Sequence, residues 1–189
     1  TGTTAQLGAD ELAAACDRLV QQVACRSLKA ALKIARQLVE RSKPHGGVLE
    51  LTAWRLLART THMSGAHAEA LRAYRKARLL ARHDRLVCAR IDRALADVYM
   101  YMGRFRDSEQ AAKRAIATFS SVGADNDLAQ TRVNYGNLLH RRDRHRDAER
   151  IYREAVAYFE KTDNRVALAR CYYNLANSLV QLFHMDEAE

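Results

Sequence analysis

The sequence predicts an all-α protein made of about four to five helical hairpins, the last of them incomplete. Two observations carry this prediction. The chain of 189 residues has one Pro and eight Gly, with 28% charged and 48% hydrophobic residues, which leaves little room for a turn-rich β architecture. In addition, apolar residues recur at helical spacing, and the pattern repeats about every 40 residues.

The repeat is clearest in the C-terminal half. The segment from Asn134, Asn-Tyr-Gly-Asn-Leu-Leu, is followed by Arg-Asp-Ala-Glu at 146–149; 40 residues later Asn174 opens Asn-Leu-Ala-Asn-Ser-Leu, followed by Asp-Glu-Ala-Glu at 186–189. Earlier copies contain Leu95 and Trp54. A constant spacing over several copies predicts stacked units of one kind.

Taken in order, the elements form one domain of consecutive units. A degenerate unit is expected over 9–42, full units over 51–88, 89–128 and 129–168, and a partial unit over 169–189. Each full unit consists of two helices joined by a short polar turn, such as Gly103-Arg104 or Asp143-Arg144. We expect the last second helix to begin near Asp186, so that the chain is a fragment of a larger protein.

Columns of small residues fix the packing within and between hairpins. A small residue on each of two facing helices lets the backbones approach toward the short end of the ~8–10 Å range. The first helices contribute Ala58, Ala96, Gly136 and Ala176; the second helices contribute Ala70, Ser108, Ala148 and Ala188, with Ala77, Ala115 and Ala155 as a further column.

These motifs resemble the tetratricopeptide repeat family. Trp54, Leu57 and Ala58 match the family's aromatic–Leu–Gly/Ala opening, and its Ala–aromatic–Ala series is matched by Ala148, Tyr152 and Ala155. The resemblance implies a right-handed α-α superhelix, or solenoid. The period of about 40 residues exceeds the family's usual 34, and the units lack the Pro that often closes a repeat of the family. In both respects the chain is similar to the longer repeats of kinesin light chain and bacterial regulators.

The resemblance also implies a binding surface. First helices line the inner, concave wall of such arrays, where Asn amides bind an extended peptide main chain and Arg binds carboxylates. Asp97 and Val133 depart from the carboxylate clamp of chaperone-binding arrays; Val133 and Met100 are expected on the exposed stripe. The expected recognition residues are Arg55, Arg59, Arg90, Arg93, Asn134, Asn137, Arg141, Arg170, Asn174 and Asn177. Alternatively, the Asn side chains only bond to neighbouring helices.

The formal net charge of +9 offers a second interpretation. Residues 51–100 hold ten basic and four acidic side chains, and the residues Arg75, Arg78, Arg82 and Arg85 are expected on one side of a second helix. Such a basic stripe suits nucleic acid or ribonucleoprotein. A solvated outer face is the more common reason for such a pattern, and no nucleic-acid motif accompanies it.

Catalysis and metal binding find no support in the sequence. No phosphate-binding Gly-rich loop, HExxH or Ser/His/Asp pattern is present, so we expect no enzyme activity and no cofactor. His62 and His67, like His140 and His145, are five residues apart; along one helix that spacing is a rotation of about 140°, which predicts poor chelation and no metal.

The partner expected is therefore a protein or extended peptide, with acidic segments favoured by the Arg residues. Self-association through an uncapped C-terminal end is a further alternative. No stretch approaches the roughly 18 apolar residues of a membrane span. The four Cys form no CxxC pair, which favours a cytoplasmic setting, and 25 Arg among 31 basic residues suggest a bacterial source.

Overall fold

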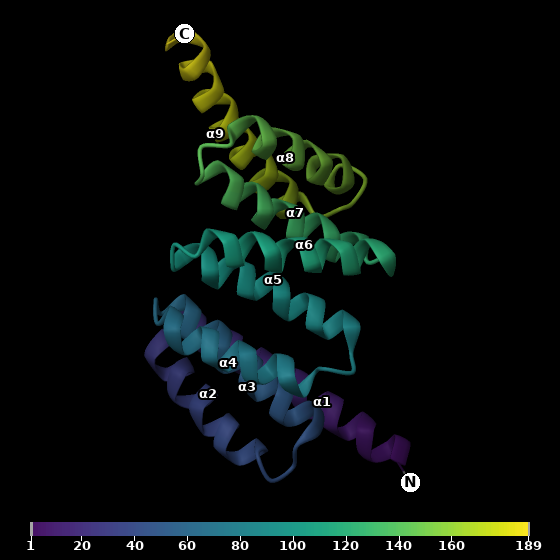
Figure 1. Cartoon of the computed structure of the whole chain (residues 1–189). Coiled ribbons are helices and arrows are strands. Elements are labelled where there is room, and N and C mark those ends of the chain that lie inside the picture. Colours follow the sequence, from purple (N-terminus) through teal and green to yellow (C-terminus); the bar gives the residue numbers. More distant parts are fainter. Residues whose placement is uncertain (1, 189) are drawn as a thin grey trace. The chain divides into compact units, whose positions relative to one another are not determined.

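A computed structural model describes the backbone of residues 2–188 and the side-chain surroundings of residues 12–183. Over that backbone the chain forms nine α-helices and no strand (Figure 1). The helices are α1 (Gly2–Arg26), α2 (Leu28–Ser42), α3 (Gly47–Met63), α4 (His67–Leu80), α5 (Arg85–Tyr101), α6 (Phe105–Ser121), α7 (Asp125–His140), α8 (His145–Phe159) and α9 (Arg165–Ala188). The chain divides within α5 into two compact units, Thr1–Ile91 and Asp92–Glu189.

The helices begin one turn earlier than the repeat boundaries drawn from the sequence. Residues 51, 89, 129 and 169 each fall inside the first turn or just beyond it in α3, α5, α7 and α9. The first turn of each helix precedes the repeat motif, and in α7 and α9 it already contributes the buried residues Leu128 and Ala167. Residues 9–42 correspond to α2 and most of α1, joined through Ser27, whose Oγ accepts a hydrogen bond from the Ala30 amide at 3.3 Å.

Residues with positive φ close the turns inside three of the hairpins. Gly65 (φ 82°), Gly103 (φ 70°) and Asp143 (φ 57°) occupy the same repeat position. Glycine and, less readily, Asp tolerate this left-handed conformation. The next copy of that position is Phe183, for which such a φ is strained. The expected turn before Asp186 is accordingly absent: α9 continues as one helix to Ala188, so the predicted second helix was wrong.

In the N-terminal unit α1, α2, α3 and α4 pack around small and aliphatic side chains. Val20, Ala31 and Leu56 form one buried cluster. Two ion pairs join helices distant in sequence: Arg36 to Glu69 at 3.1 Å and Arg59 to Asp17 at 2.9 Å. Each pair is well exposed and therefore adds little to stability; burial of apolar surface holds this unit together.

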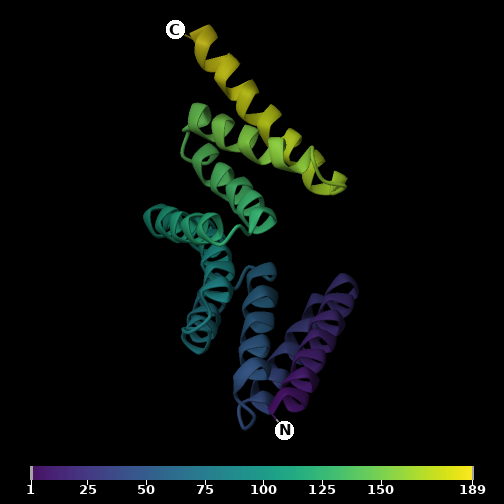
Figure 2. The ribbon, with the colours of Figure 1, turned by 90° about the vertical axis from the view of Figure 1, so that its right-hand side faces the viewer.

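In the C-terminal unit α7 and α8 form an antiparallel hairpin, and α9 packs against both (Figure 2). Its core contains Tyr152, Phe159 and Cys171, each at most 1% exposed. The burial of the small columns confirms their predicted role: apart from Ala176, which is exposed, the described members are all buried, and Ala188 lies outside the described side chains. Leu175 of α9 is buried in the same core.

Candidate functional site

The side chain of Arg93, expected on the binding wall, binds other residues of the C-terminal unit. Its Nη1 donates to Asp127 Oδ1 at 2.8 Å and to Gln130 Oε1 at 3.2 Å, and its guanidinium carbon lies 5.9 Å from the centre of the Phe119 ring. The side chains of Arg93 and Asp127 are 22% and 13% exposed. A partly buried, charge-assisted pair of this kind ties α5 to α7, so the first role of Arg93 is structural.

Asn137 is also engaged inside its own hairpin. The Tyr152 hydroxyl donates to Asn137 Oδ1 at 2.7 Å, and burial raises the pKa of that hydroxyl far above its ordinary value. This contact matches the alternative in which Asn side chains tie helices together. No such bond is present for Asn134 among the described residues, and Asn134 is half-buried on the same helix.

Arg141 caps the C-terminal end of α7 and is exposed. Its guanidinium carbon lies 5.0 Å from the centre of the Tyr101 ring, a cation–π contact that holds the charge in a defined place. The preceding residue, His140, has its Nδ1 3.0 Å from Ser178 Oγ of α9. This contact joins the end of α7 to α9, on which the residue before Ser178, Asn177, is exposed like Arg141.

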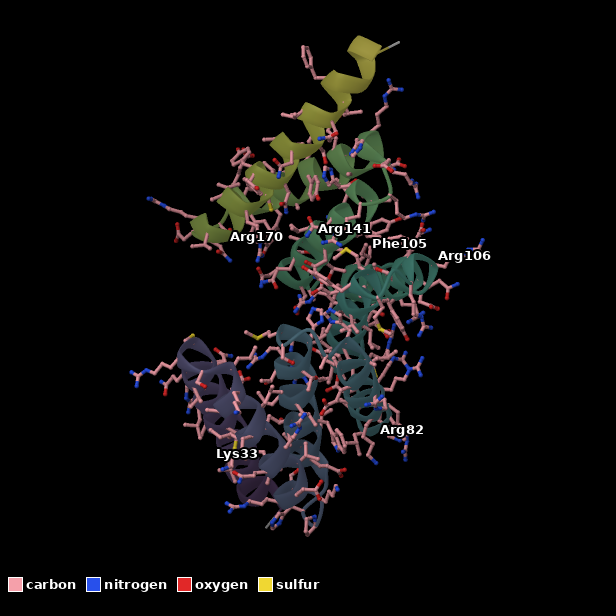
Figure 3. The ribbon with its side chains drawn as sticks, turned by 90° about the vertical axis from the view of Figure 1, so that its left-hand side faces the viewer. Lys33, Arg82, Phe105, Arg106, Arg141 and Arg170 are labelled. Carbon is pink, nitrogen blue, oxygen red and sulfur yellow. The ribbon has the colours of Figure 1, made fainter. Side chains whose placement is uncertain are left out.

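The exposed side of α9 carries the remaining predicted residues of this unit. Arg170 and Asn177 are exposed and Asn174 is half-buried. Figure 3 labels Arg170 on α9 and Arg141, the residue that follows the end of α7. Tyr173, which the sequence places beside them, is 68% exposed. A large aromatic ring left so open on a helix that also exposes polar side chains is typical of a recognition surface.

Two members of the expected exposed stripe are buried instead. Val133 is 1% exposed because it belongs to the core in which Cys171 and Leu175 of α9 pack. Met100 is 5% exposed and occupies the repeat position of His62 and His140, whose side chains contact residues across the hairpin turn. Helical spacing alone does not reveal packing against a later helix, such as that of α9 on Val133.

In the N-terminal unit, Arg55 and Arg90 are exposed, while Arg59 forms the ion pair with Asp17 described above. The four residues of the basic stripe are all exposed, but they do not share one helix. Arg75 and Arg78 lie on α4, Arg82 lies in the following turn (Figure 3) and Arg85 begins α5. The stripe predicted on a single second helix was therefore wrong, because α4 ends at Leu80.

The two His pairs are in contact, contrary to the argument from helix rotation. His62 Nδ1 lies 3.1 Å from His67 Nδ1, and His140 Nδ1 lies 3.2 Å from His145 Nδ1. Each pair spans a hairpin turn, so its members sit on different helices. Burial, followed by repulsion from His145, lowers the pKa of His140. No group of three or more His, Cys, Asp or Glu suited to a metal occurs among the described residues.

None of the helices described is both long and apolar enough to cross a bilayer. The expected recognition residues thus fall into two groups. Arg59, Arg93 and Asn137 bind other residues of their own unit, whereas Arg141, Arg170 and Asn177 present their side chains to solvent around α7 and α9. Tyr101 and Tyr173 were not among the expected recognition residues, although both are exposed.

Comparison with known proteins supports the repeat assignment. The sequence profile of the tetratricopeptide repeat matches residues 87–161 and 127–189, together more than half of the chain. A comparison with curated proteins gave no match. Repeats of this family are generally protein-interaction scaffolds and are typically non-catalytic.

Two solved structures share the fold. The crystal structure of a Podosopora anserina putative kinesin light chain with nearly identical TPR-like repeats has a TM-score of 0.71 at 14% identity, covering 95% of this chain and 89% of that one. BtubC (BKLC) from P. vanneervenii has a TM-score of 0.67 at 16% identity, covering 95% and 86%. These likenesses confirm the predicted all-α repeat class, and with the matching profile they show that the chain belongs to the tetratricopeptide repeat family.

Proposed function

We propose that this chain is a non-catalytic binding module that recognises an extended segment of a protein partner on the surface formed by α7 and α9. The single observation that carries the proposal is the exposed set on these helices: Arg141, Arg170, Tyr173 and Asn177. We name this set the α7/α9 surface. It combines an aromatic face, two cations and an amide within a family of protein-interaction scaffolds.

The chemistry of the α7/α9 surface suits an extended peptide. The Asn177 amide can donate to a peptide carbonyl and accept from a peptide amide at the same time. Asn174, half-buried one turn earlier on α9, and Asn134 on α7 offer the same pair of functions. Main-chain recognition of this kind requires an extended segment, because a folded helix has already paired its amides and carbonyls.

The two cations favour a partner with acidic residues or a free carboxyl terminus. The Tyr101 ring keeps the Arg141 guanidinium in place, which lowers the entropy lost when it binds a carboxylate. Arg170 is exposed, and Tyr173 beside it is 68% exposed. A peptide that pairs an acidic side chain with an apolar one would satisfy both neighbours.

Selection from a random peptide display library on the full-length chain, followed by calorimetric titration, tests the proposal. We expect acidic, extended peptides to be enriched and Arg170→Glu to weaken their binding at least tenfold. Arg150→Glu is the matched control: Arg150 is also exposed, 69% by side chain, but lies on α8. Equal losses for the two reversals, or none for Arg170→Glu, would contradict the α7/α9 surface.

The same preparation separates the alternative partners. In a salt titration with random RNA and DNA, the proposal predicts no binding that depends on Arg75 or Arg85. Light scattering over a range of concentrations tests self-association, and a mass that rises with concentration and falls in a Tyr173→Ser variant would assign this surface to a second copy of the chain instead.

A further inference from the structure

The N-terminal unit contains a cavity of about 400 Å³ between α1, α2 and α3, a volume within the roughly 300–1,000 Å³ range of small-molecule sites. Its walls are largely aliphatic. Leu12 and Ala13 come from α1, Leu38 from α2, and Leu49 and Ala53 from α3. We propose that this cavity binds a small amphipathic carboxylate, such as a medium-chain fatty acid, with the hydrocarbon inside and the carboxylate at the turn between α2 and α3.

The basic side chains among the described residues that line the cavity lie at the end of α2 and in the following turn. Arg41 and His45 line the cavity and are exposed. The backbone fixes their positions: the amides of His45 and Gly46 both donate to the Ser42 carbonyl, at 3.0 and 3.1 Å. Gly46 and Gly47 have φ of 60° and 55°, a conformation that glycine adopts readily. This turn therefore holds the His45 imidazole beside the end of the cavity.

The beginning of α3 adds backbone donors at the same place. Gly46, the N-cap residue, offers no side-chain cap, so the first amides of this 17-residue helix lack a side-chain acceptor, and Leu49 in its first turn lines the cavity. Such amides and the helix dipole favour an anion. Neither Asp nor Glu is among the described lining residues. The nearby carboxylate of Glu50 accepts from the Trp54 indole at 3.2 Å.

An apolar interior with basic side chains at one end suits both parts of the ligand. A neutral hydrocarbon would make no use of Arg41 and His45, which are exposed to solvent, whereas a short anion such as acetate would leave the aliphatic walls hydrated. For a ligand of about ten non-hydrogen atoms such as octanoate, we expect a Kd on the order of 1 mM.

Cys16 provides a reporter for occupancy of the cavity. Its side chain lines the cavity and is half-buried, whereas Cys25 on the same helix is exposed and lies outside the lining. The experiment measures the alkylation rate of each thiol in the full chain with iodoacetamide, resolved by peptide mass spectrometry, with and without 10 mM sodium octanoate. We expect octanoate to slow Cys16 at least fivefold and to leave Cys25 unchanged.

Variants and related probes test the charge requirement. Arg41→Gln is expected to weaken protection by octanoate about tenfold, the effect of losing one charge-assisted contact. Lys43→Gln is the matched control, since Lys43 lies in the same segment but binds Glu40 at 2.7 Å and does not line the cavity. Octan-1-ol, compared with octanoate at one concentration below the solubility of the alcohol in water, and acetate at 10 mM should both protect weakly.

Three outcomes would overturn the proposal. Octanoate that leaves the Cys16 rate unchanged would show that the cavity does not take the ligand. Equal protection by octanol and octanoate would show that no carboxylate is recognised. Equal losses of protection in Arg41→Gln and Lys43→Gln would show that the effect comes from the net charge of the region and not from a contact with Arg41. Circular dichroism of each variant checks that the helices are intact.

Discussion

The close approach of α7 and α8 at Gly136 gives the sharpest test of the packing. A Cβ atom added there would lie 2.4 Å from Cε1 and 2.7 Å from Cδ1 of Tyr152, whereas carbon atoms normally meet at about 3.5–4.0 Å. The Tyr152 ring is 1% exposed, and its hydroxyl is bonded to Asn137. The ring therefore has little room to move, and Gly136→Ala must overpack the hairpin.

Two opposing terms set the size of the effect. Overpacking a dense core costs typically 1–3 kcal/mol, or roughly 3 here, since three ring atoms are affected. Ala improves helix propensity over Gly by about 1 kcal/mol. We expect Gly136→Ala to lower the free energy of unfolding by about 2 kcal/mol, equivalent to a drop in Tm of about 4–8 °C for a chain of this size.

A double-mutant cycle with Tyr152→Ala, measured by urea denaturation followed by circular dichroism, isolates this contact. The residue at the same repeat position in α6 is Ala112, beside Ala96, so the double variant reproduces a pair already present in the chain. Tyr152→Ala alone should cost about 3–5 kcal/mol. In its background Gly136→Ala should stabilise by about 1 kcal/mol, because only the propensity gain remains. An equal effect in both backgrounds would refute the steric argument.

Three further results are expected. The folded state favours neutral His140, whose pKa lies below its ordinary value, so the unfolded state binds more protons and the free energy of unfolding should fall as pH drops from about 7.5 to 5.5. An H140M/H145F variant, which copies the pair at this position in the preceding repeat, should reduce this pH dependence in acid unfolding curves. An unchanged pH dependence would contradict the role given to His140. The coupling energy of Arg93 and Asp127, measured with single and double Ala variants, should reach about 1 kcal/mol or more because both side chains are partly buried, and a value near zero would show that the pair is not structural. Burial raises the pKa of the Cys171 thiol, so Cys171 should react more slowly with iodoacetamide at pH 8 than Cys25, which is exposed. Equal rates would mean that the core around Cys171 opens readily.

The hairpin architecture was predictable because it depends on short-range spacing. Small residues such as Ala58 and Ala148 recur at a constant interval, and the structure buries both completely. The turns at Gly103 and Asp143 were predicted in the same way, and Gly65 occupies the same repeat position. The same reasoning, applied to Phe183, accounts for the uninterrupted α9, since a bulky side chain disfavours the left-handed turn.

The candidate site was less predictable because partners distant in sequence decide which polar side chains remain available. Nothing within one repeat indicates that Arg93 binds Asp127 or that Arg59 binds Asp17, 34 and 42 residues apart. The contact of His140 with His145 was missed for a different reason. Rotation along one helix was applied to residues on either side of a turn, and the signal for the turn, Asp143-Arg144, was already recognised in the sequence.

The α7/α9 surface is tested most directly by ¹H–¹⁵N correlation spectra of the full chain titrated with a selected acidic peptide. The account predicts that the largest shifts fall on the backbone amides near Arg141 and Arg170 and on the side-chain amides of Asn134, Asn174 and Asn177. Shifts confined to α4 or to the exposed side of α8, with those Asn side-chain signals unchanged, would contradict it.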